Sequence, residues 1–356
     1  MSDITLHVNG MKYRGWQDAK ATLSMDACFS EFTLQLTQDW PDQVYGVGLP
    51  KVRKNDECVL KLNNETVVTG FISRRRLRTD EDGFTLNVSG KDRTALLFKS
   101  GVLRDPAEWV NQTPEQIISD ICRPFGISVI NLAPEINKPF KKFTLTPGET
   151  ANRAIERVCR HRGLLYFANR LGNLVLATAL SASRSSARLL HGKGGNVLGC
   201  DLDDSLDNRN SEYIVMSQNN GQDWASEGHT KVTGRAKDHG VKLYSPKVII
   251  ADEPEDEDGL TELAITMAAV NAGRGQTIDY PVADWSQGKE APLWDINMEV
   301  PVQDDLEGTN QIRLIKKCVF SVSEKQAAET LLTVTDPKAF TLRAEPEKDE
   351  GGWNAS

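Results

Sequence analysis

Apolar and polar residues alternate with a period of two near the start of this chain. Residues 32–37 read FTLQLT, and residues 58–62 repeat the alternation. Successive side chains of a β-strand point to opposite faces of a sheet, so this period predicts strands with one buried face. The dipeptide Asp82-Gly83 separates two more strand-like runs. It is a typical hairpin turn, because glycine tolerates a positive φ.

Several short strands with turns between them predict a small β-barrel or sandwich over residues 1–102. We expect a second β region of the same kind over residues 197–234 and 293–343. Its strands should lie at residues 213–216, 296–300, 318–322 and 332–334. The fold class is therefore expected to be α+β and predominantly β, with two small β regions; the two β-barrel tube domains are what the family resemblance given below implies.

An acidic insertion, residues 235–292, is expected to interrupt the second β region. It contains the acidic run 252–258, followed by apolar residues at helical spacing from Leu260 to Ala268. Acidic residues just before a helix suit the positive end of its dipole. The polar tail, residues 344–356, is expected to be disordered.

Residues 103–196 are expected to form an α+β module. Thr113-Pro114-Glu115-Gln116 predicts a helix start, with threonine as N-cap and glutamine at the capping-box position. The same device is expected at Thr146-Pro147, and the helix should end near Gly163. Its buried positions, spaced three and four apart, should be Ala151, Ala154, Ile155 and Val158.

A hairpin should follow, with strands at 164–167 and 174–176 around a turn at 169–173. Residues 181–196, rich in serine, arginine and glycine, are interpreted as a connector. One weak internal echo links the two β regions. Residues 84–90 and 330–336 both place an apolar residue, then valine, then serine or threonine before a turn, which leaves a duplication open.

Charge and cysteine usage narrow the function classes. The formal net charge of −8 argues against a protein whose main function is to bind nucleic acid. It is compatible with a conduit that passes DNA without binding it. The six cysteines form no C-x-x-C pair, and we expect reduced thiols that fill core positions. The sequence offers no signal peptide and no membrane span.

Searches for catalytic, cofactor and metal motifs give no candidate. The five histidines form no H-E-x-x-H and do not stand at metal spacing. His191-Gly192-Lys193 lacks the rest of a phosphate loop. The carboxylate cluster from Asp201 to Asp207 does not match a calcium loop, and we interpret it as a solvated turn. We therefore expect no enzyme, no cofactor and no metal.

Two groups of arginines are candidate contacts to neighbouring subunits or to a channel. Alternate arginines on one strand could meet phosphates, pair with acids of a neighbouring subunit such as the 252–258 run, or be solvated; the net charge favours the last two readings. A second set lies along one face of the helix predicted after residue 146. The candidate residues are Arg74, Arg76, Arg78, Arg153, Arg157, Arg160, Asp252 and Glu253.

The order of motifs resembles the baseplate hub proteins of contractile-tailed phages. That family also includes the late control protein D group and the hub part of type VI secretion spike proteins. The resemblance covers about the first 180 residues well, and the rest matches in order and length. It rests on residues 8–16, 29–34, 55–60, 68–72, 89–94, 146–150, 154–157 and 162–165.

The resemblance implies a homotrimer in which two barrel domains per chain alternate around a pseudo-sixfold tube. Such a hub would join the sixfold tail tube or adjoining baseplate proteins to a membrane-piercing spike, and would pass DNA during infection. The chain ends at Ser356 without spike repeats, so the spike is expected to be a separate protein. The expected location is the virion tail baseplate, assembled in the host cytoplasm. A ring would also bury strand edges that otherwise aggregate.

Two other functions stay open at the level of sequence. A barrel that binds single-stranded nucleic acid would show aromatic residues among basic ones, and no aromatic residue interleaves the arginine strand 74–78. A tail-associated peptidoglycan hydrolase needs only two carboxylates, which any sequence offers. Neither alternative accounts for the ordered series of motifs.

Overall fold

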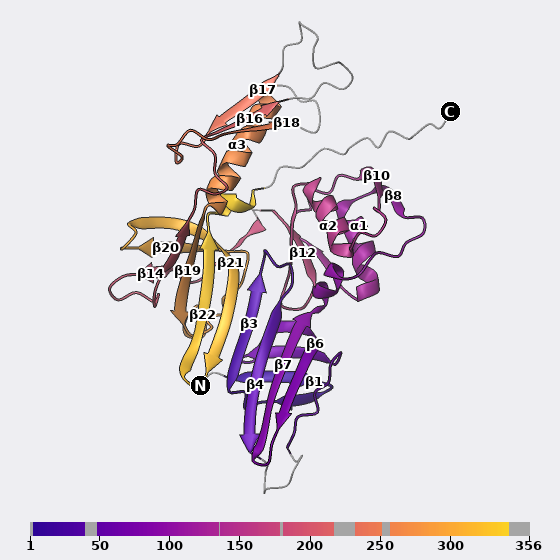
Figure 1. Ribbon diagram of the computed structural model, residues 1–356, viewed down its shortest axis with the longest axis vertical. Helices are drawn as coiled ribbons and strands as arrows, with labels where there is room; N and C mark the ends of the chain where they lie inside the picture. Colours follow the sequence, from indigo (N-terminus) through magenta and orange to yellow (C-terminus); the bar gives the residue numbers. More distant parts are fainter. Residues whose placement is uncertain are drawn as a thin grey trace.

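The computed structural model describes residues 3–39, 48–134, 136–178, 181–216, 232–250 and 257–341. Two β regions stand side by side, and a helical module lies against the first of them (Figure 1). A smaller unit, made of one helix and three strands, projects beyond the second β region. The expected α+β fold, mostly β, is confirmed.

Seven strands form the first β region, in the order β3-β4-β7-β6-β5-β1-β2. The predicted hairpin is confirmed, but for another reason than a positive φ at Gly83. The Asp80 carboxylate accepts the N–H groups of Asp82 and Gly83, and a Cβ on Gly83 would lie 2.3 Å from the Gln38 carbonyl oxygen. The strands are β1 Ile4–Val8, β2 Met11–Tyr13, β3 Asp18–Ser24, β4 Glu31–Asp39, β5 Glu57–Leu62, β6 Glu65–Thr79 and β7 Gly83–Asp92.

The second β region is built around the order β15-β19-β22-β21, with β20 beside β21. The expected connector at 181–196 is wrong in part, because two short strands there pair in parallel with β20 and satisfy its outer backbone groups. The strands are β13 Ser183–Arg184, β14 Leu189–His191, β15 Asp201–Asp204, β19 Gln276–Ala283, β20 Met298–Asp304, β21 Thr309–Ser323 and β22 Gln326–Thr335.

The two β regions are continuous, because β21 pairs with β3 from Lys317–Ser24 to Val322–Ala19. The result is one 14-stranded sheet with one hydrophobic core that draws on both regions. Among the described residues the strand order runs from β15 to β2 without closing, so two closed barrels are not seen. Each β region instead presents open edges.

The helical module has a core of its own, in which α1 packs beside α2. Thr113 forms the predicted capping box with Gln116. The second predicted start is wrong: Thr150 is the N-cap, because Gly148 has φ +79° and the Glu149 side chain turns back to the Thr146 N–H. The elements are η2 Arg93–Phe98, β8 Glu108–Gln112, α1 Pro114–Cys122, η3 Arg123–Phe125, β9 Val129–Asn131, β10 Phe140–Thr144, α2 Ala151–Arg160, β11 Leu165–Ala168 and β12 Leu174–Ala177.

The projecting unit comprises β16 Glu212–Met216, β17 Thr233–Lys237, β18 Pro246–Ile250 and α3 Glu257–Arg274. The strand near Tyr213 was expected in the second β region, but it pairs with β17 and β18 instead. Tyr213 is buried against α3 in a separate small core. Conversely, β19 lies within the expected insertion 235–292 and pairs with β22 of the main sheet. The acidic residues 252–256 and the tail 342–356 lie outside the described residues.

The corrected helix start can be tested by two alanine substitutions. The Thr150 hydroxyl accepts the Arg153 N–H, so we expect Thr150→Ala to reduce the free energy of unfolding by about 1 kcal/mol. Thr146→Ala, which removes the hydroxyl expected from sequence, should cost at most a few tenths of that. Urea denaturation of both variants measures the difference. Equal losses would contradict the assignment of Thr150.

Candidate functional site

Half of strand β6 forms an exposed basic edge. β7 pairs with β6 from Gly70 to Thr79, whereas β5 pairs with it only from Glu65 to Phe71. From Arg74 to Arg78 the other edge therefore has no strand neighbour among the described residues. The side chains of the four arginines on it, 74, 75, 76 and 78, are exposed and form no hydrogen bond or ion pair within the described part of the chain. Leu77 between them packs partly against the main core.

Strand β15 forms an exposed acidic edge at the other end of the sheet. The aspartates from Asp201 onward were expected in a solvated turn, but Asp201–Asp204 pairs antiparallel with β19. The expectation failed because the short strand lacks a clear apolar alternation. Its outer edge has no neighbour among the described residues. Asp201, Asp203 and Asp204 are exposed, while Leu202 packs partly against the main core.

The candidate arginines of α2 lie in the helical module, in a different unit from β6. The Arg157 guanidinium pairs with Glu149 at 2.9 Å, donates to the Thr144 carbonyl oxygen at 2.7 Å and stacks over Phe143. Arg160 pairs with Glu156 at 3.1 Å. Arg153 is exposed. Arg157 and Arg160 are therefore both engaged in ion pairs within the helical module. Asp252 and Glu253 lie outside the described residues.

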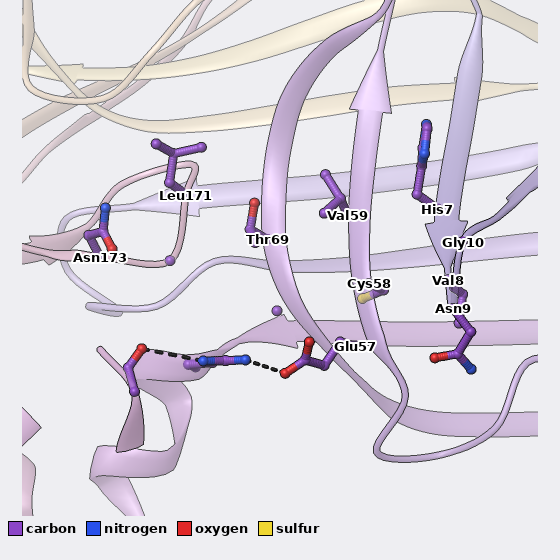
Figure 2. A pocket seen from close by; sticks show the side chains of 14 residues that line it. His7, Val8, Asn9, Gly10, Glu57, Cys58, Val59, Thr69, Leu171 and Asn173 are labelled. Carbon is purple, nitrogen blue, oxygen red and sulfur yellow. Dashed lines mark hydrogen bonds and ion pairs between the residues drawn. The ribbon is translucent and has the colours of Figure 1, made fainter. Parts of the chain in front are cut away.

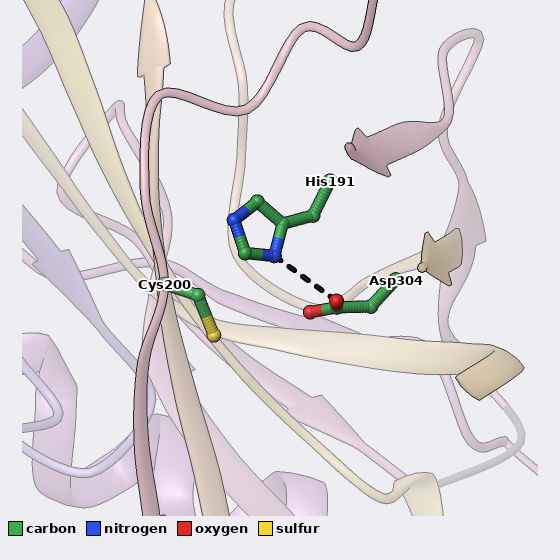
Figure 3. Close-up of side chains that lie close together, drawn as sticks. All are labelled: His191, Cys200 and Asp304. Carbon is green, nitrogen blue, oxygen red and sulfur yellow. Dashed lines mark ion pairs between the residues drawn. The ribbon is translucent and has the colours of Figure 1, made fainter. Parts of the chain in front are cut away.

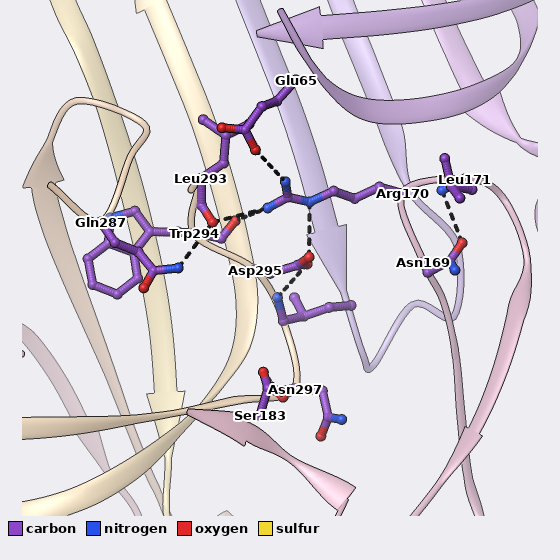
Figure 4. Close-up of polar contacts among 11 residues, drawn as sticks. Glu65, Asn169, Arg170, Leu171, Ser183, Gln287, Leu293, Trp294, Asp295 and Asn297 are labelled. Carbon is purple, nitrogen blue, oxygen red and sulfur yellow. Dashed lines mark hydrogen bonds and ion pairs between the residues drawn. The ribbon is translucent and has the colours of Figure 1, made fainter. Parts of the chain in front are cut away.

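Arg170 joins all three larger units, as Figure 4 shows. It stands in the turn between β11 and β12, and its guanidinium donates to the Trp294 carbonyl oxygen at 2.5 Å. It also pairs with Asp295 of the second β region at 3.0 Å and with Glu65 of the first at 3.6 Å. Burial raises the pKa of Asp295, and the Arg170 charge offsets this only in part. Sequence reasoning missed this network, because its partners lie more than a hundred residues apart.

Loss of the Arg170 charge should loosen the joint between the units. We expect Arg170→Met to lower the free energy of unfolding by about 2 to 3 kcal/mol, since it leaves Asp295 without its cation. Leu171→Ala is the matched control, because Leu171 is 60% exposed in the same turn and should change little. Denaturation followed by tryptophan fluorescence measures both. Equal stability of the two variants would rule out a joining role.

A fully buried carboxylate, Asp92, closes β7 onto the helix η2. It accepts the Ser30 N–H at 2.6 Å, the Thr94 N–H at 3.0 Å and the Thr94 hydroxyl at 2.5 Å. Burial is the dominant influence and raises the pKa of Asp92 to about 6, against the lowering effect of these donors. Its contacts are all structural, so it holds a turn in place.

This carboxylate should give the protein a distinct pH dependence. The unfolded chain loses the Asp92 proton near pH 3.8, whereas the folded protein keeps it until about pH 6. Stability from the protonated form is therefore present below pH 3.8 and lost as pH rises to about 6. The difference in unfolding free energy between wild type and Asp92→Asn should shift by about 3 kcal/mol across that window. A difference that stays constant with pH would contradict this.

A shallow pocket of about 370 Å³ lies between the first β region and the helical module (Figure 2). Arg93 lines it and is held by Glu57 and by the Gly126 carbonyl oxygen. Burial raises the pKa of the Cys58 thiol to about 12, so this sulfur is not a nucleophile near neutral pH. Burial and nearby Lys61 lower the pKa of His7. The pocket offers shape without an activated nucleophile.

His191, Cys200 and Asp304 converge beside β20 (Figure 3), although no spacing in the sequence suggested it. Their possible ligand atoms lie within 4.8 Å of one another. The Asp304 oxygens are already occupied: Tyr280 donates at 2.9 Å, the Leu306 N–H at 3.0 Å, and His191 Nδ1 lies 3.0 Å away. Burial alone would raise the pKa of Asp304, but these donors together lower it. The cluster therefore fixes the turn that follows β20.

Three family models match separate parts of the chain. Residues 3–92 match the family described as Mu phage baseplate assembly protein GpP-like, N-terminal, and residues 94–178 match Baseplate hub protein gp44-like, second domain. Residues 265–343 match Mu phage baseplate assembly protein GpP, fourth domain. Over 353 residues the chain is 26% identical to baseplate hub protein gp44 of Escherichia phage Mu. The alignment covers 97% of this chain and 90% of that protein.

Together these matches support a phage baseplate hub similar to that of phage Mu. Solved structures agree with this assignment. The 43 kDa tail protein of prophage MuSo2 from Shewanella oneidensis shares 26% identity, with a TM-score of 0.83 over 96% of this chain and 100% of that one. A tail protein from Neisseria meningitidis MC58 has the same fold at 19% identity, with a TM-score of 0.77 over 96% and 99%.

The family boundaries of these hub proteins follow the units of the structure. The first match ends at Asp92, where β7 meets η2, and the second covers the helical module. The third begins within α3 and includes β19 to β22. Among the described residues, no helix has the length and apolar character that a membrane crossing would need.

Proposed function

We propose that this chain is a structural, non-enzymatic hub that closes into a homotrimeric, pseudo-sixfold ring in the tail baseplate of a virion. The ring would join the tail tube or adjoining baseplate proteins to a separate spike and would let DNA pass without sequence-specific binding. Assembly would take place in the host cytoplasm. The two β regions would act as the two tube units of each chain. Each would take the place of one of the two expected barrel domains.

One observation carries the proposal: the two β regions are joined edge to edge by the pairing of β21 with β3. A sheet built this way can be extended by adding further copies at its two open edges. A chain that contributes two similar units needs three copies for a six-part ring. Heterologous contacts of this kind generate either a closed ring or an open filament, and a hub requires closure.

The surface of the sheet supports a passage for DNA. Opposite the core, hydroxyl pairs such as Thr33 with Ser89, at 3.4 Å, and Thr37 with Thr85, at 3.3 Å, line neighbouring strands. These hydroxyl groups share the face with charged side chains: Lys91 pairs with Glu31 at 3.5 Å, and the strand register places Arg74, Arg76 and Arg78 on the same side as Ser89, Asn87 and Thr85. Rows of unpaired cations bind phosphates strongly and in a salt-dependent way, so the proposed passage requires that acidic groups of a neighbouring chain pair with the β6 arginines in the ring.

The two alternative functions have less support. Binding of single-stranded nucleic acid would need exposed aromatic residues beside the β6 arginines, and the alternation there places only Leu77 among them. Hydrolysis of peptidoglycan would need paired carboxylates in a cleft. Asp304 is instead committed to a turn, and the pocket beside Glu57 holds that carboxylate against Arg93.

Native mass spectrometry and light scattering test the proposal directly. We expect a species of three chains, close to three times the 39.4 kDa of one chain, at micromolar concentration. Addition of the spike protein encoded nearby should produce a stable complex with three hub chains. A strict monomer under both conditions would overturn the ring. Clearing of peptidoglycan by the purified trimer would instead favour the hydrolase.

A further inference from the structure

The two β regions repeat one another at the level of single residues. The β6–β7 hairpin has a bulge between Ile72 and Arg74, and the β21–β22 hairpin has a bulge between Ile315 and Lys317. If the bulges are aligned, Asp92 at the end of β7 falls on Asp336, which follows β22. Each of these aspartates caps a 3-10 helix by accepting the N–H two residues later. The weak echo in the sequence was therefore real, but its register was wrong by two residues.

The strands around the two hairpins correspond as well. β4 lies beside β7 as β19 lies beside β22, and β5 lies beside β6 as β20 lies beside β21. Asn55 and Asn297 both have a positive φ, and each donates its N–H to the isoleucine before the bulge, at 2.8 and 3.0 Å. On the outside, β3 flanks β4 as β15 flanks β19.

One contact of the first repeat has no counterpart within the chain. The second half of β21 pairs with β3, at Cys318–Leu23, Val319–Thr22, Phe320–Ala21 and Ser321–Lys20. In the repeat, β6 corresponds to β21 and β15 corresponds to β3. The equivalent contact would therefore join the second half of β6 to strand β15. Both are the open edges described above. β15 ends the strand order in the second β region, and β6 lies in the first β region with β19, β22, β21, β3, β4 and β7 between them, so one chain cannot bring them together.

We propose that the basic edge of β6 pairs antiparallel with the acidic edge of β15 of a second copy of this chain. The inference rests on the proposed ring and deepens it by naming the contact that closes it. Transfer of the β21–β3 register through the repeat places Arg75 opposite Asp204, Arg76 opposite Asp203, Leu77 opposite Leu202 and Arg78 opposite Asp201.

The chemistry of these four positions fits the register. Each arginine meets an aspartate, and cross-strand pairs of opposite charge stabilise a sheet. Leu77 and Leu202, which both pack partly against the main core, would meet on the same face and join the cores of neighbouring chains. A shift by one residue would place Leu77 opposite an aspartate. The sequence left open whether these arginines pair with acids of a neighbouring subunit, such as the run 252–258, or are solvated, and the proposed seam assigns them the aspartates of β15 instead.

Charge also explains why this seam is selective. Pairing of β6 with another β6, or of β15 with another β15, would oppose like charges, which disfavours a closed dimer of two identical edges. Only the β6–β15 contact brings opposite charges together, and it leaves one edge of each kind open until the ring closes. The β21–β3 seam within the chain is tethered and needs no such selection. Its paired positions carry two charges, both positive, on Lys20 and Lys317, and each lies opposite a serine.

Charge reversal tests the proposal on the full-length protein. We expect Asp201→Lys, Asp203→Lys and Asp204→Lys together to convert the trimer to monomer at micromolar concentration, and Arg75→Glu, Arg76→Glu and Arg78→Glu together to do the same. A chain with both sets reversed should regain the trimer. The matched control, Asp252→Lys with Glu253→Lys, should stay trimeric. Circular dichroism of each variant separates loss of assembly from loss of folding.

A cysteine cross-link tests the register without changing charge. Paired antiparallel residues have Cα atoms about 4.5 to 5.5 Å apart, which suits a disulfide. Leu77→Cys with Leu202→Cys should give covalent trimers on a non-reducing gel after mild oxidation. Each single variant, and Leu77→Cys with Asp204→Cys, should give none, although the six native cysteines are present in all of them.

The outcomes separate this inference from the proposed ring. A wild-type trimer that survives both charge reversals, or that dissociates only in the 252–253 control, would overturn the β6–β15 seam and leave the ring standing. A wild-type protein that stays monomeric, alone and with the spike, would overturn the ring itself. Cross-linking at the shifted pair instead of Leu77–Leu202 would refute the register.

Discussion

The antiparallel pairing of β21 with β3 is the contact on which the architecture depends. It connects strands almost three hundred residues apart and turns two small sheets into one continuous surface with a shared core. Neither β region would bury its inner face as well alone, because each leaves an unpaired edge. Arg170 reinforces the same joint from the helical module by binding carboxylate and carbonyl groups of both regions. Pairing of strand edges therefore organises the chain, and the proposed ring would extend the same kind of contact to neighbouring chains.

Local patterns in the sequence predicted the elements far better than their partners. The Thr113 capping box, the 82–83 hairpin and the apolar face of α2 followed from spacing alone, because their physics spans a few residues. The assignment of the Tyr213 strand failed because alternation shows that a strand has a buried face and not which sheet it joins. The Thr146 start failed because Gly148 adopts a left-handed conformation that no helix accepts.

The candidate site shows the same division. The arginines of β6 were recognised as an unusual strand face, but their neighbours in space were not available from spacing. The Asp201–Asp204 strand was taken for a turn, since three carboxylates in four residues mask its single apolar position. The arginines of β6 and the aspartates of β15 could be matched only after the bulges of the β6–β7 and β21–β22 hairpins aligned the two repeats residue by residue. Long-range register, set by tertiary packing, is what one sequence without relatives cannot supply.

The projecting unit of β16, β17, β18 and α3 breaks the equivalence of the two repeats. It is inserted between β15 and β19, whereas the corresponding strands β3 and β4 are joined by residues 25–30 alone. In a ring of alternating repeats, this appendage would recur at every second position around the rim. The strands of the ring would then follow approximate sixfold symmetry, whereas the projecting units would follow threefold symmetry. A threefold partner could find its orientation from these protrusions without any departure from symmetry in the tube wall itself.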